Sequence, residues 1–286
     1  MPSNDPKSSK VARRDQAREQ ARQLREQQKK KERRNRIVAI TGLVAAVVVL
    51  AVVAVTIVRQ GSSSSTAVVS YTGDDADTIT LSDVTGPSTA NSTGGIPVGA
   101  DSVAGDTAAD GDVVVSIYLD YMCPYCGQFE EANDSELTAL REEGGVIVEY
   151  HIISFLDDSS SGTEYSTRAG NAAAIVADQA PEDFSAFSSA LFANQPDEGG
   201  TGLTDDEIAD LALGVGVSQD VVDTFTETVS DTDGRLFAKW LAANTNYTSE
   251  TLGGISTPTV LINGTAFSGD LYTAGDLTDA IEAAKG

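Results

Sequence analysis

The pattern of hydrophobic and polar positions divides the chain into three parts. The longest apolar run extends from Ile37 to Val58, contains 22 residues without a charged side chain, and is bounded by Arg36 and Arg59. About 20 apolar residues span the hydrocarbon core of a bilayer. A buried helix of a soluble protein would show a polar face, and a cleaved signal peptide has a shorter apolar run, roughly 7–15 residues. The pattern therefore predicts a retained transmembrane helix over residues 37–58.

The segment that follows the apolar run has a different composition. Residues 59–110 are rich in Ser, Thr, Gly, Asp and Ala, and no apolar period persists in them. Such a composition is typical of a flexible linker. Two short apolar pieces, AVVSY (67–71) and GIPVG (95–99), could nevertheless dock onto a neighbouring domain.

A folded domain is predicted over residues 111–286. The β-branched run VVVSIYL (113–119) has the length of a strand that is buried on both faces. An amphipathic helical pattern follows and stops at Gly144-Gly145, before a second strand pattern at 145–156. A strand–helix–strand unit of this kind predicts parallel strands joined by a right-handed crossover.

Helical patterns then fill an insert over about residues 162–250, before the chain returns to strands. The predicted helices cover residues 167–180, 181–195, 204–216, 218–229 and 234–247. A strand is predicted at 256–264, and Asn263-Gly264 is a strong signal for a hairpin with residues 265–269. With a closing helix over 276–285, the order predicts an α/β domain in which a helical insert separates two sheet-forming halves.

Charge is distributed very unevenly between the two ends of the chain. Residues 1–36 contain thirteen Lys and Arg against five Asp and Glu, whereas residues 60–286 contain five against 38. Because Lys and Arg flanking a span remain cytoplasmic, the basic segment is expected inside the cell and the acidic domain outside. The span makes the lipid bilayer an expected partner through residues 37–58. The acidity of the domain argues against nucleic acid as a partner.

Only two cysteines occur in the chain, Cys123 and Cys126 in the sequence CPYC. A structural disulfide across two residues would constrain little chain entropy, and a metal site lacks ligands because His151 is the only histidine. A redox pair is the remaining interpretation. Cys123 is placed between a strand and a helix, where the helix N-terminus stabilises a thiolate, and Pro124 suits the first turn. Cys123 is therefore the expected nucleophile and Cys126 the resolving thiol; no metal or cofactor is expected.

A second feature expected at this site is Thr257-Pro258, which precedes the last predicted long strand. A cis bond there would place backbone groups of Thr257 beside Cys123, where an extended substrate segment could pair as an added strand. Pro124 and Tyr125 are the other expected substrate contacts. An apolar rim for unfolded substrates is predicted from Tyr121, Met122, Tyr125 and Phe129, although core packing also explains Met122 and Phe129.

The order of these motifs resembles the thioredoxin superfamily, and most closely its DsbA-like branch in the membrane-tethered forms of Gram-positive bacteria. The resemblance covers about residues 95–285. It rests on CPYC after VVVSIYLDYM, the helical insert, and STPTVLING before a final hairpin and helix. The resemblance implies that Cys123 is the nucleophile, Cys126 the resolving cysteine and Pro258 the cis-proline.

The sequence departs from the family pattern in two ways. Many relatives carry an acidic residue six positions before the first cysteine, where this chain has Ile117. Asp120 is closer to Cys123 and could transfer protons or only cap the helix. The middle pair Pro-Tyr also differs from the Pro-His of strong oxidants, so the redox direction is left open.

The sequence as a whole predicts an extracytoplasmic thiol–disulfide oxidoreductase that introduces disulfides into exported proteins. Exported protein thiols or disulfides are the expected substrates, and a separate membrane redox partner is expected to reoxidise the enzyme. A disulfide isomerase or reductase using the same residues is one alternative. A module that binds exported chains without redox chemistry is the other.

Overall fold

The computed structural model describes residues 69–285, which form the acidic domain and most of the predicted linker. The predicted basic segment (1–36), the predicted transmembrane helix (37–58) and the first part of the predicted linker lie outside these residues. Within residues 69–285, no helix is both long enough and apolar enough to cross a bilayer.

A five-stranded sheet forms the centre of the domain, in the order β1-β3-β2-β6-β7. Strand β2 is parallel to β3, which confirms the predicted strand–helix–strand unit. β2 is antiparallel to β6, so the strand predicted after the helical insert joins the same sheet. The strands are β1 (Ile96–Val98), β2 (Val113–Leu119), β3 (Val146–Ile152), β6 (Thr259–Ile262) and β7 (Thr265–Ala266). β6 and β7 are joined at Asn263-Gly264, where both residues have positive φ, as a type I′ turn requires.

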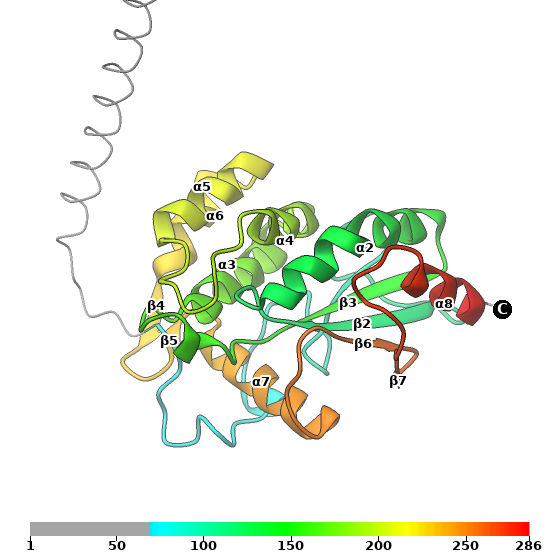
Figure 1. Cartoon of the computed structure of the whole chain (residues 1–286). Coiled ribbons are helices and arrows are strands. Elements are labelled where there is room, and N and C mark those ends of the chain that lie inside the picture. Colours follow the sequence, from blue (N-terminus) through cyan, green and yellow to red (C-terminus); the bar gives the residue numbers. More distant parts are fainter. Residues whose placement is uncertain (1–68, 286) are drawn as a thin grey trace, which may run out of the picture. The chain divides into compact units, whose positions relative to one another are not determined.

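Helices cover both faces of this sheet. α2 (Pro124–Glu143) and α8 (Asp276–Lys285) pack on one face, and α7 (Ala238–Leu252) packs on the other (Figure 1). β2 lies between these layers, with Val115 and Ile117 buried, because a strand covered on both faces must be apolar throughout. The carboxyl end of β2 leads directly into the loop before α2, which is where the cysteine motif lies.

The predicted helical insert is present and begins with α3 (Tyr165–Gln179), α4 (Phe184–Ala193), α5 (Asp205–Val215) and the short α6 (Gln219–Val222). α3 is buried on nearly its whole circumference, because its run of alanines allows the neighbouring helices α4 and α7 to approach closely. α4 packs against α2, which brings the insert beside the cysteine motif (Figure 1).

The prediction of helix over 218–229 and from residue 234 was wrong in part. The chain instead forms a small antiparallel ribbon of β4 (Thr228–Ser230) and β5 (Gly234–Arg235) before α7 begins at Ala238. Gly234 has a φ of +69°, which a helix does not allow. Arg235 is buried, donates to Asp205 Oδ2 at 2.7 Å and also donates to the carbonyl of Phe225. These distant partners hold the extended backbone at Arg235.

The prediction of a flexible linker up to residue 110 was also wrong for its second part. β1 pairs antiparallel with β3, and Ile79, Ile96 and Val98 are buried in the domain. The Asn91 side chain donates to Glu149 Oε1 at 2.8 Å, which ties this segment to the sheet. The alternative that GIPVG docks onto the domain is therefore confirmed, and the folded unit starts well before residue 111.

Candidate active site

Cys123 is the N-cap residue of α2 and Pro124 is its first helical residue. The backbone N–H of Cys123 donates to the carbonyl of Asp120 at 3.0 Å, which closes a tight turn between β2 and the helix. Pro at this position sacrifices no hydrogen bond, because the first N–H groups of a helix have no partner within it. The predicted strand–helix junction is thus confirmed, with the sulfur at the positive end of the helix.

The environment of Cys123 favours its thiolate. The pKa of Cys123 is lowered to about 6, first because Cys126 donates a hydrogen bond from its thiol, and further by the Thr257 hydroxyl and by the N–H groups of Cys126 and Tyr125; burial opposes this shift. Cys126 behaves in the opposite way. Burial and the neighbouring sulfur raise the pKa of Cys126 well above its usual range. The two thiols therefore differ as a nucleophile and a protonated resolving thiol do.

The two cysteines are free thiols in this structure, and both are buried. The side chain of Cys126 is more deeply buried than that of Cys123, because Cys126 lies one turn into α2, against the sheet. Its backbone N–H donates to the carbonyl of Cys123 at 2.9 Å. This first-turn hydrogen bond keeps both cysteines on the same side of the helix.

Thr257-Pro258 reaches the same place from the far end of the chain. The peptide bond is cis, as predicted, and Pro258 is buried at the start of β6. The Cys123 thiol donates to the carbonyl of Thr257 at 3.4 Å. The Thr257 hydroxyl is buried and has no partner of ordinary geometry among residues 69–285, so its O–H is free for the sulfur. The structure brings together Cys123, Cys126, Thr257 and Pro258 as the sequence predicted.

Asp120 is fully buried, and its carboxylate joins three segments. It accepts hydrogen bonds from the N–H groups of Met122 (2.8 Å) and Leu156 (3.0 Å) and from the Ser166 hydroxyl (2.7 Å). Burial raises the pKa of Asp120 to about 7 despite these donors. Asp120 thus does not cap the helix itself; it ties the turn before Cys123 to the insert. The position of the missing family acid, Ile117, is packed in the core of the sheet.

The predicted apolar rim is not formed as expected. Tyr121, Met122 and Phe129 are buried in the core, and only Tyr125 is exposed, at 58 %. Tyr125 instead pairs with Tyr272, which is 45 % exposed and lies 6.0 Å away between ring centroids. Tyr272 comes from the loop between β7 and α8, and no sequence motif marks it. The two rings form an exposed aromatic pair beside the cysteine motif.

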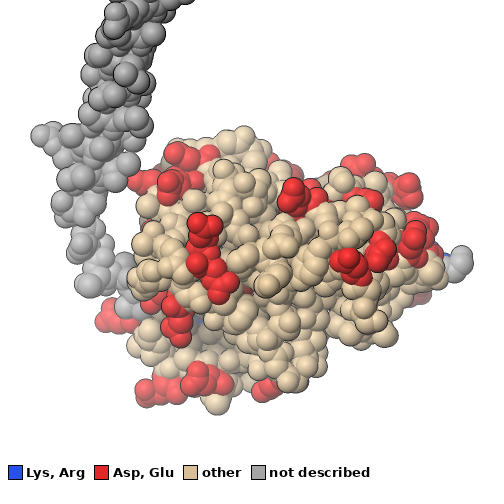
Figure 2. All heavy atoms as spheres, in the orientation of Figure 1, with Lys and Arg blue, Asp and Glu red and all other residues tan. Residues whose placement is uncertain are grey.

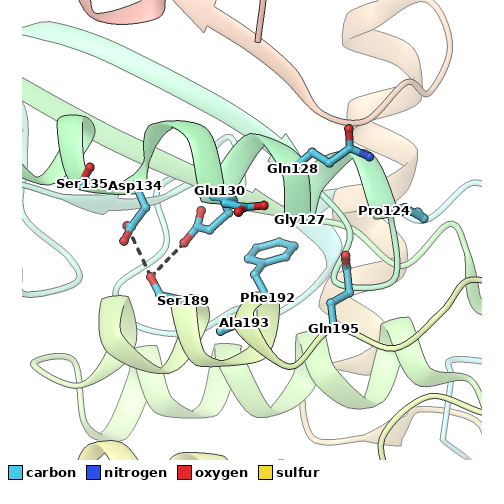
Figure 3. Close-up of a pocket in the computed structure, with 11 residues that line it drawn as sticks. Pro124, Gly127, Gln128, Glu130, Asp134, Ser135, Ser189, Phe192, Ala193 and Gln195 are labelled. Carbon is cyan, nitrogen blue, oxygen red and sulfur yellow. Dashed lines mark hydrogen bonds between the residues drawn. The ribbon is translucent and has the colours of Figure 1, made fainter. Parts of the chain in front are cut away.

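A groove of about 710 Å³ adjoins the motif between α2 and α4 (Figure 3). Its lining includes Pro124 and Gly127 at the start of α2, acidic side chains further along α2, and Phe192 and Gln195 from α4 and its end. Glu130 lies in its wall and accepts a hydrogen bond from Ser189 at 2.9 Å. Burial, followed by the nearby charge of Asp134, raises the pKa of Glu130 to about 7.

The surface around the site is acidic. Figure 2 shows Asp and Glu side chains spread over this face, with Lys and Arg scarcely visible. Only five Lys and Arg occur after residue 60, and three of them, Arg141, Arg168 and Arg235, are buried. The other two, Lys239 and Lys285, each form an ion pair with a neighbouring carboxylate. Little positive charge on the described surface balances its carboxylates.

His151 lies in β3 away from the cysteines. Its ring stacks on Tyr118, with 4.3 Å between centroids, and its Nε2 lies 3.7 Å from Glu149 Oε2. His151 therefore belongs to the packing of the sheet, as expected for a structural histidine.

Comparison with known proteins agrees with this geometry. The family model described as thioredoxin matches residues 98–283, which is more than half of the chain. Among curated proteins, the serine/threonine-protein kinase PknE of Mycobacterium tuberculosis is 39% identical over 106 residues, or 36% of this chain. The chain matches only 19% of the length of that kinase, so the likeness is limited to one part of it.

Solved structures give matches that extend over most of the described domain. The reduced disulfide bond oxidoreductase DsbG of Mycobacterium tuberculosis is 28% identical, with a TM-score of 0.54 over 67% of this chain and 88% of that one. Oxidized DsbA of the same organism is also 28% identical, with a TM-score of 0.53 over 67% and 93%. MdbA of Actinomyces oris, at 22% identity and a TM-score of 0.56 over 74% and 96%, shows the same fold. From its domain match and its redox-motif geometry, the chain belongs to the thioredoxin family and is DsbA-like in structure.

Proposed function

We propose that this protein is a membrane-anchored thiol–disulfide oxidoreductase that introduces disulfides into exported proteins. One observation carries the proposal: the Cys123 sulfur lies at the N-terminus of α2, within 3.4 Å of the Thr257 carbonyl, with a lowered pKa and with a protonated Cys126 behind it. A purely structural cysteine pair would not need a lowered pKa at one thiol and a raised pKa at the other.

The reaction begins with a Cys123–Cys126 disulfide. A substrate thiolate attacks Cys123 Sγ, the bond between the two enzyme sulfurs breaks, and Cys126 leaves as a thiolate that takes up a proton. A second substrate thiolate then attacks the substrate sulfur of the mixed disulfide, and Cys123 leaves as a thiolate. The substrate gains one disulfide and loses two electrons, which the enzyme holds as its two thiols.

The direction of electron flow follows from the stability of the reduced form. Because hydrogen bonds and the helix terminus stabilise the Cys123 thiolate, reduction of the enzyme disulfide is favoured and the disulfide is a stronger oxidant. The description of the DsbG structure as a disulfide bond oxidoreductase supports this class of reaction.

The proposed location and partners extend this reaction to the whole chain. Residues 37–58 would anchor the protein in the membrane, with residues 1–36 in the cytoplasm and the domain outside. A separate membrane redox partner would accept the two electrons from the reduced enzyme. The substrate would lie against Thr257, Pro124 and Tyr125, and Tyr272 would enlarge this surface.

The direct test is the redox chemistry of the full chain. We expect the oxidised protein to form disulfides in reduced ribonuclease A, and we expect a reduction potential well above that of cytosolic thioredoxin. A potential at or below that of cytosolic thioredoxin, together with rapid insulin reduction, would instead assign the protein as a reductase. Rescue of scrambled rather than reduced ribonuclease A would assign an isomerase. A Cys123→Ser variant that retains full function in cells would favour a binding module without redox chemistry.

A further inference from the structure

One side chain of the helical insert reaches the backbone of the redox motif. Gln195 follows the C-terminal end of α4, and its Nε2 donates to the carbonyl oxygens of Tyr121 and Cys123, both at 2.9 Å. Figure 3 shows Gln195 extending from the end of α4 toward the first turn of α2. The insert is therefore hydrogen-bonded to the residue that carries the nucleophilic sulfur.

The orientation of the Gln195 amide is fixed by its partners. Both partners are carbonyl oxygens, which only accept hydrogen bonds, so the NH₂ group must face them and both of its donors are used. The amide oxygen then faces Gly127. A Cβ added to Gly127 would lie 2.3 Å from Gln195 Oε1, too close for both atoms to remain in place. The absence of a side chain at Gly127 is thus what allows Gln195 to occupy this position.

The two hydrogen bonds act on peptide groups next to the sulfur. The carbonyl of Cys123 already accepts from the N–H groups of Cys126 (2.9 Å) and Gly127 (3.3 Å). A further donor holds this peptide group in a fixed direction, and with it the N–H groups of the first turn of α2. The two N–H bonds of the Gln195 amide also offset the partial negative charges of the Tyr121 and Cys123 carbonyl oxygens, which lie close to the thiolate. Both effects favour the charged form of the sulfur.

We propose that Gln195 is a positioning residue that maintains the thiolate of Cys123 by holding the carbonyls of Tyr121 and Cys123. The proposal rests on the assignment of Cys123 as the nucleophile. It also gives the helical insert a role in the redox chemistry, because a displacement of the end of α4 relative to α2 would change the reactivity of Cys123.

The test measures the pH profile of Cys123 alkylation by iodoacetamide in the reduced full chain, with the modified site identified by mass spectrometry. Gln195→Met keeps the length of the side chain and removes both donors. We expect the midpoint of the profile to rise by roughly half a pH unit to one pH unit, so that alkylation below the midpoint slows by about three- to tenfold. Asn194→Ala is the control, since Asn194 is exposed and its side chain donates only to Ala190 in its own helix. We expect no shift in this control.

Gly127→Ala provides a second route to the same effect. The new Cβ would displace Gln195 while alanine favours the helix more than glycine, so the midpoint should rise without loss of thermal stability. In a Gln195→Ala background the Cβ has room, and Gly127→Ala should then shift the midpoint no further. This route also decides the matter if the Gln195→Met protein does not fold.

The possible outcomes separate this proposal from the proposed function. If wild-type Cys123 reacts no faster than an ordinary thiol at neutral pH, the assignment of Cys123 as the nucleophile fails. If Cys123 is reactive but neither Gln195→Met nor Gly127→Ala moves the midpoint, the role of Gln195 is overturned and the proposed function stands.

Discussion

The sulfur of Cys123 lies 3.4 Å from the carbonyl oxygen of Thr257, although 134 positions separate the two residues in the chain. Cys123 comes from the first half of the sheet-forming sequence, and Thr257 comes from the second half, after the helical insert. β2 and β6 are neighbours in the sheet, and their pairing brings the two residues together. The candidate site therefore exists only in the folded domain.

The hydroxyl of Thr257 is expected to tune the reactivity of Cys123. It is buried, and it is one of the groups that lower the pKa of Cys123. Thr257→Val removes this donor with little change of shape. We expect the pKa of Cys123 to rise by roughly half a unit to one unit, measured from the ultraviolet absorbance of the thiolate during a pH titration.

Thr259→Val is the matched control for this substitution. Thr259 is two residues further along the chain, at the start of β6, and its hydroxyl donates to the carbonyl of Ser256 rather than to a sulfur. The control should titrate like the wild type. Equal titration curves for Thr257→Val and the wild type would show that the Thr257 hydroxyl does not act on the thiolate.

The two cysteines are expected to give different products when each is replaced. Cys126→Ser leaves a reactive Cys123 without a resolving thiol, so it should form a mixed disulfide with substrate that persists. Cys123→Ser leaves only a buried thiol with a raised pKa and should form none. Non-reducing electrophoresis after incubation with a substrate carrying an activated disulfide measures both products. Equal amounts of adduct from the two variants would contradict the assigned roles.

The stability of the domain should depend on the protonation of Glu130. Its pKa in the folded protein is raised to about 7 from an ordinary value of 4.5, because the carboxyl is buried near Asp134. The folded state therefore binds this proton more tightly than the unfolded state does. The contribution of Glu130 to the free energy of unfolding is most favourable below about pH 4.5 and is lost as the pH rises toward 7.

Glu130→Gln is expected to remove this loss. The amide stays neutral at every pH and can still accept the hydrogen bond from Ser189. We expect the variant to be more stable than the wild type at pH 8 by about 3 kcal/mol and nearly equal to it at pH 4, measured by urea unfolding. Glu131→Gln, at an exposed neighbouring position, is the control. A constant difference between Glu130→Gln and the wild type at both pH values would contradict the raised pKa.

Local sequence signals were sufficient for most of the sheet and failed where distant contacts decide the conformation. The β-branched run of β2 and the turn at Asn263-Gly264 are defined by adjacent residues, and both were predicted. The ribbon of β4 and β5 was wrongly predicted as helix. Its extended backbone depends on the hydrogen bond from Arg235 to the distant Asp205, which local sequence signals do not reveal. The packing of β1 was predicted only as one of two alternatives, since a three-residue strand in a polar segment has no period of its own.

The candidate site shows the same division. Cys123 and Cys126 were found because strand, motif and helix follow one another directly in the sequence. Gln195 was missed, because its partners are backbone carbonyls that any sequence provides. Tyr272 was missed as well, since it lies in a loop without a motif and meets Tyr125 only in the folded domain.

The acidic surface predicts a preference among substrates. Three of the five Lys and Arg after residue 60 are buried, and the other two are paired, so the field around the site is negative. A cysteine peptide flanked by lysines should be oxidised about tenfold faster at low ionic strength than the same peptide flanked by glutamates. The difference should shrink as salt is added, because exposed charges are screened over about 10 Å at 0.1 M. Stopped-flow measurement of the two peptides over a range of salt concentrations tests this, and rates that are equal at low salt would show that the surface charge does not select substrates.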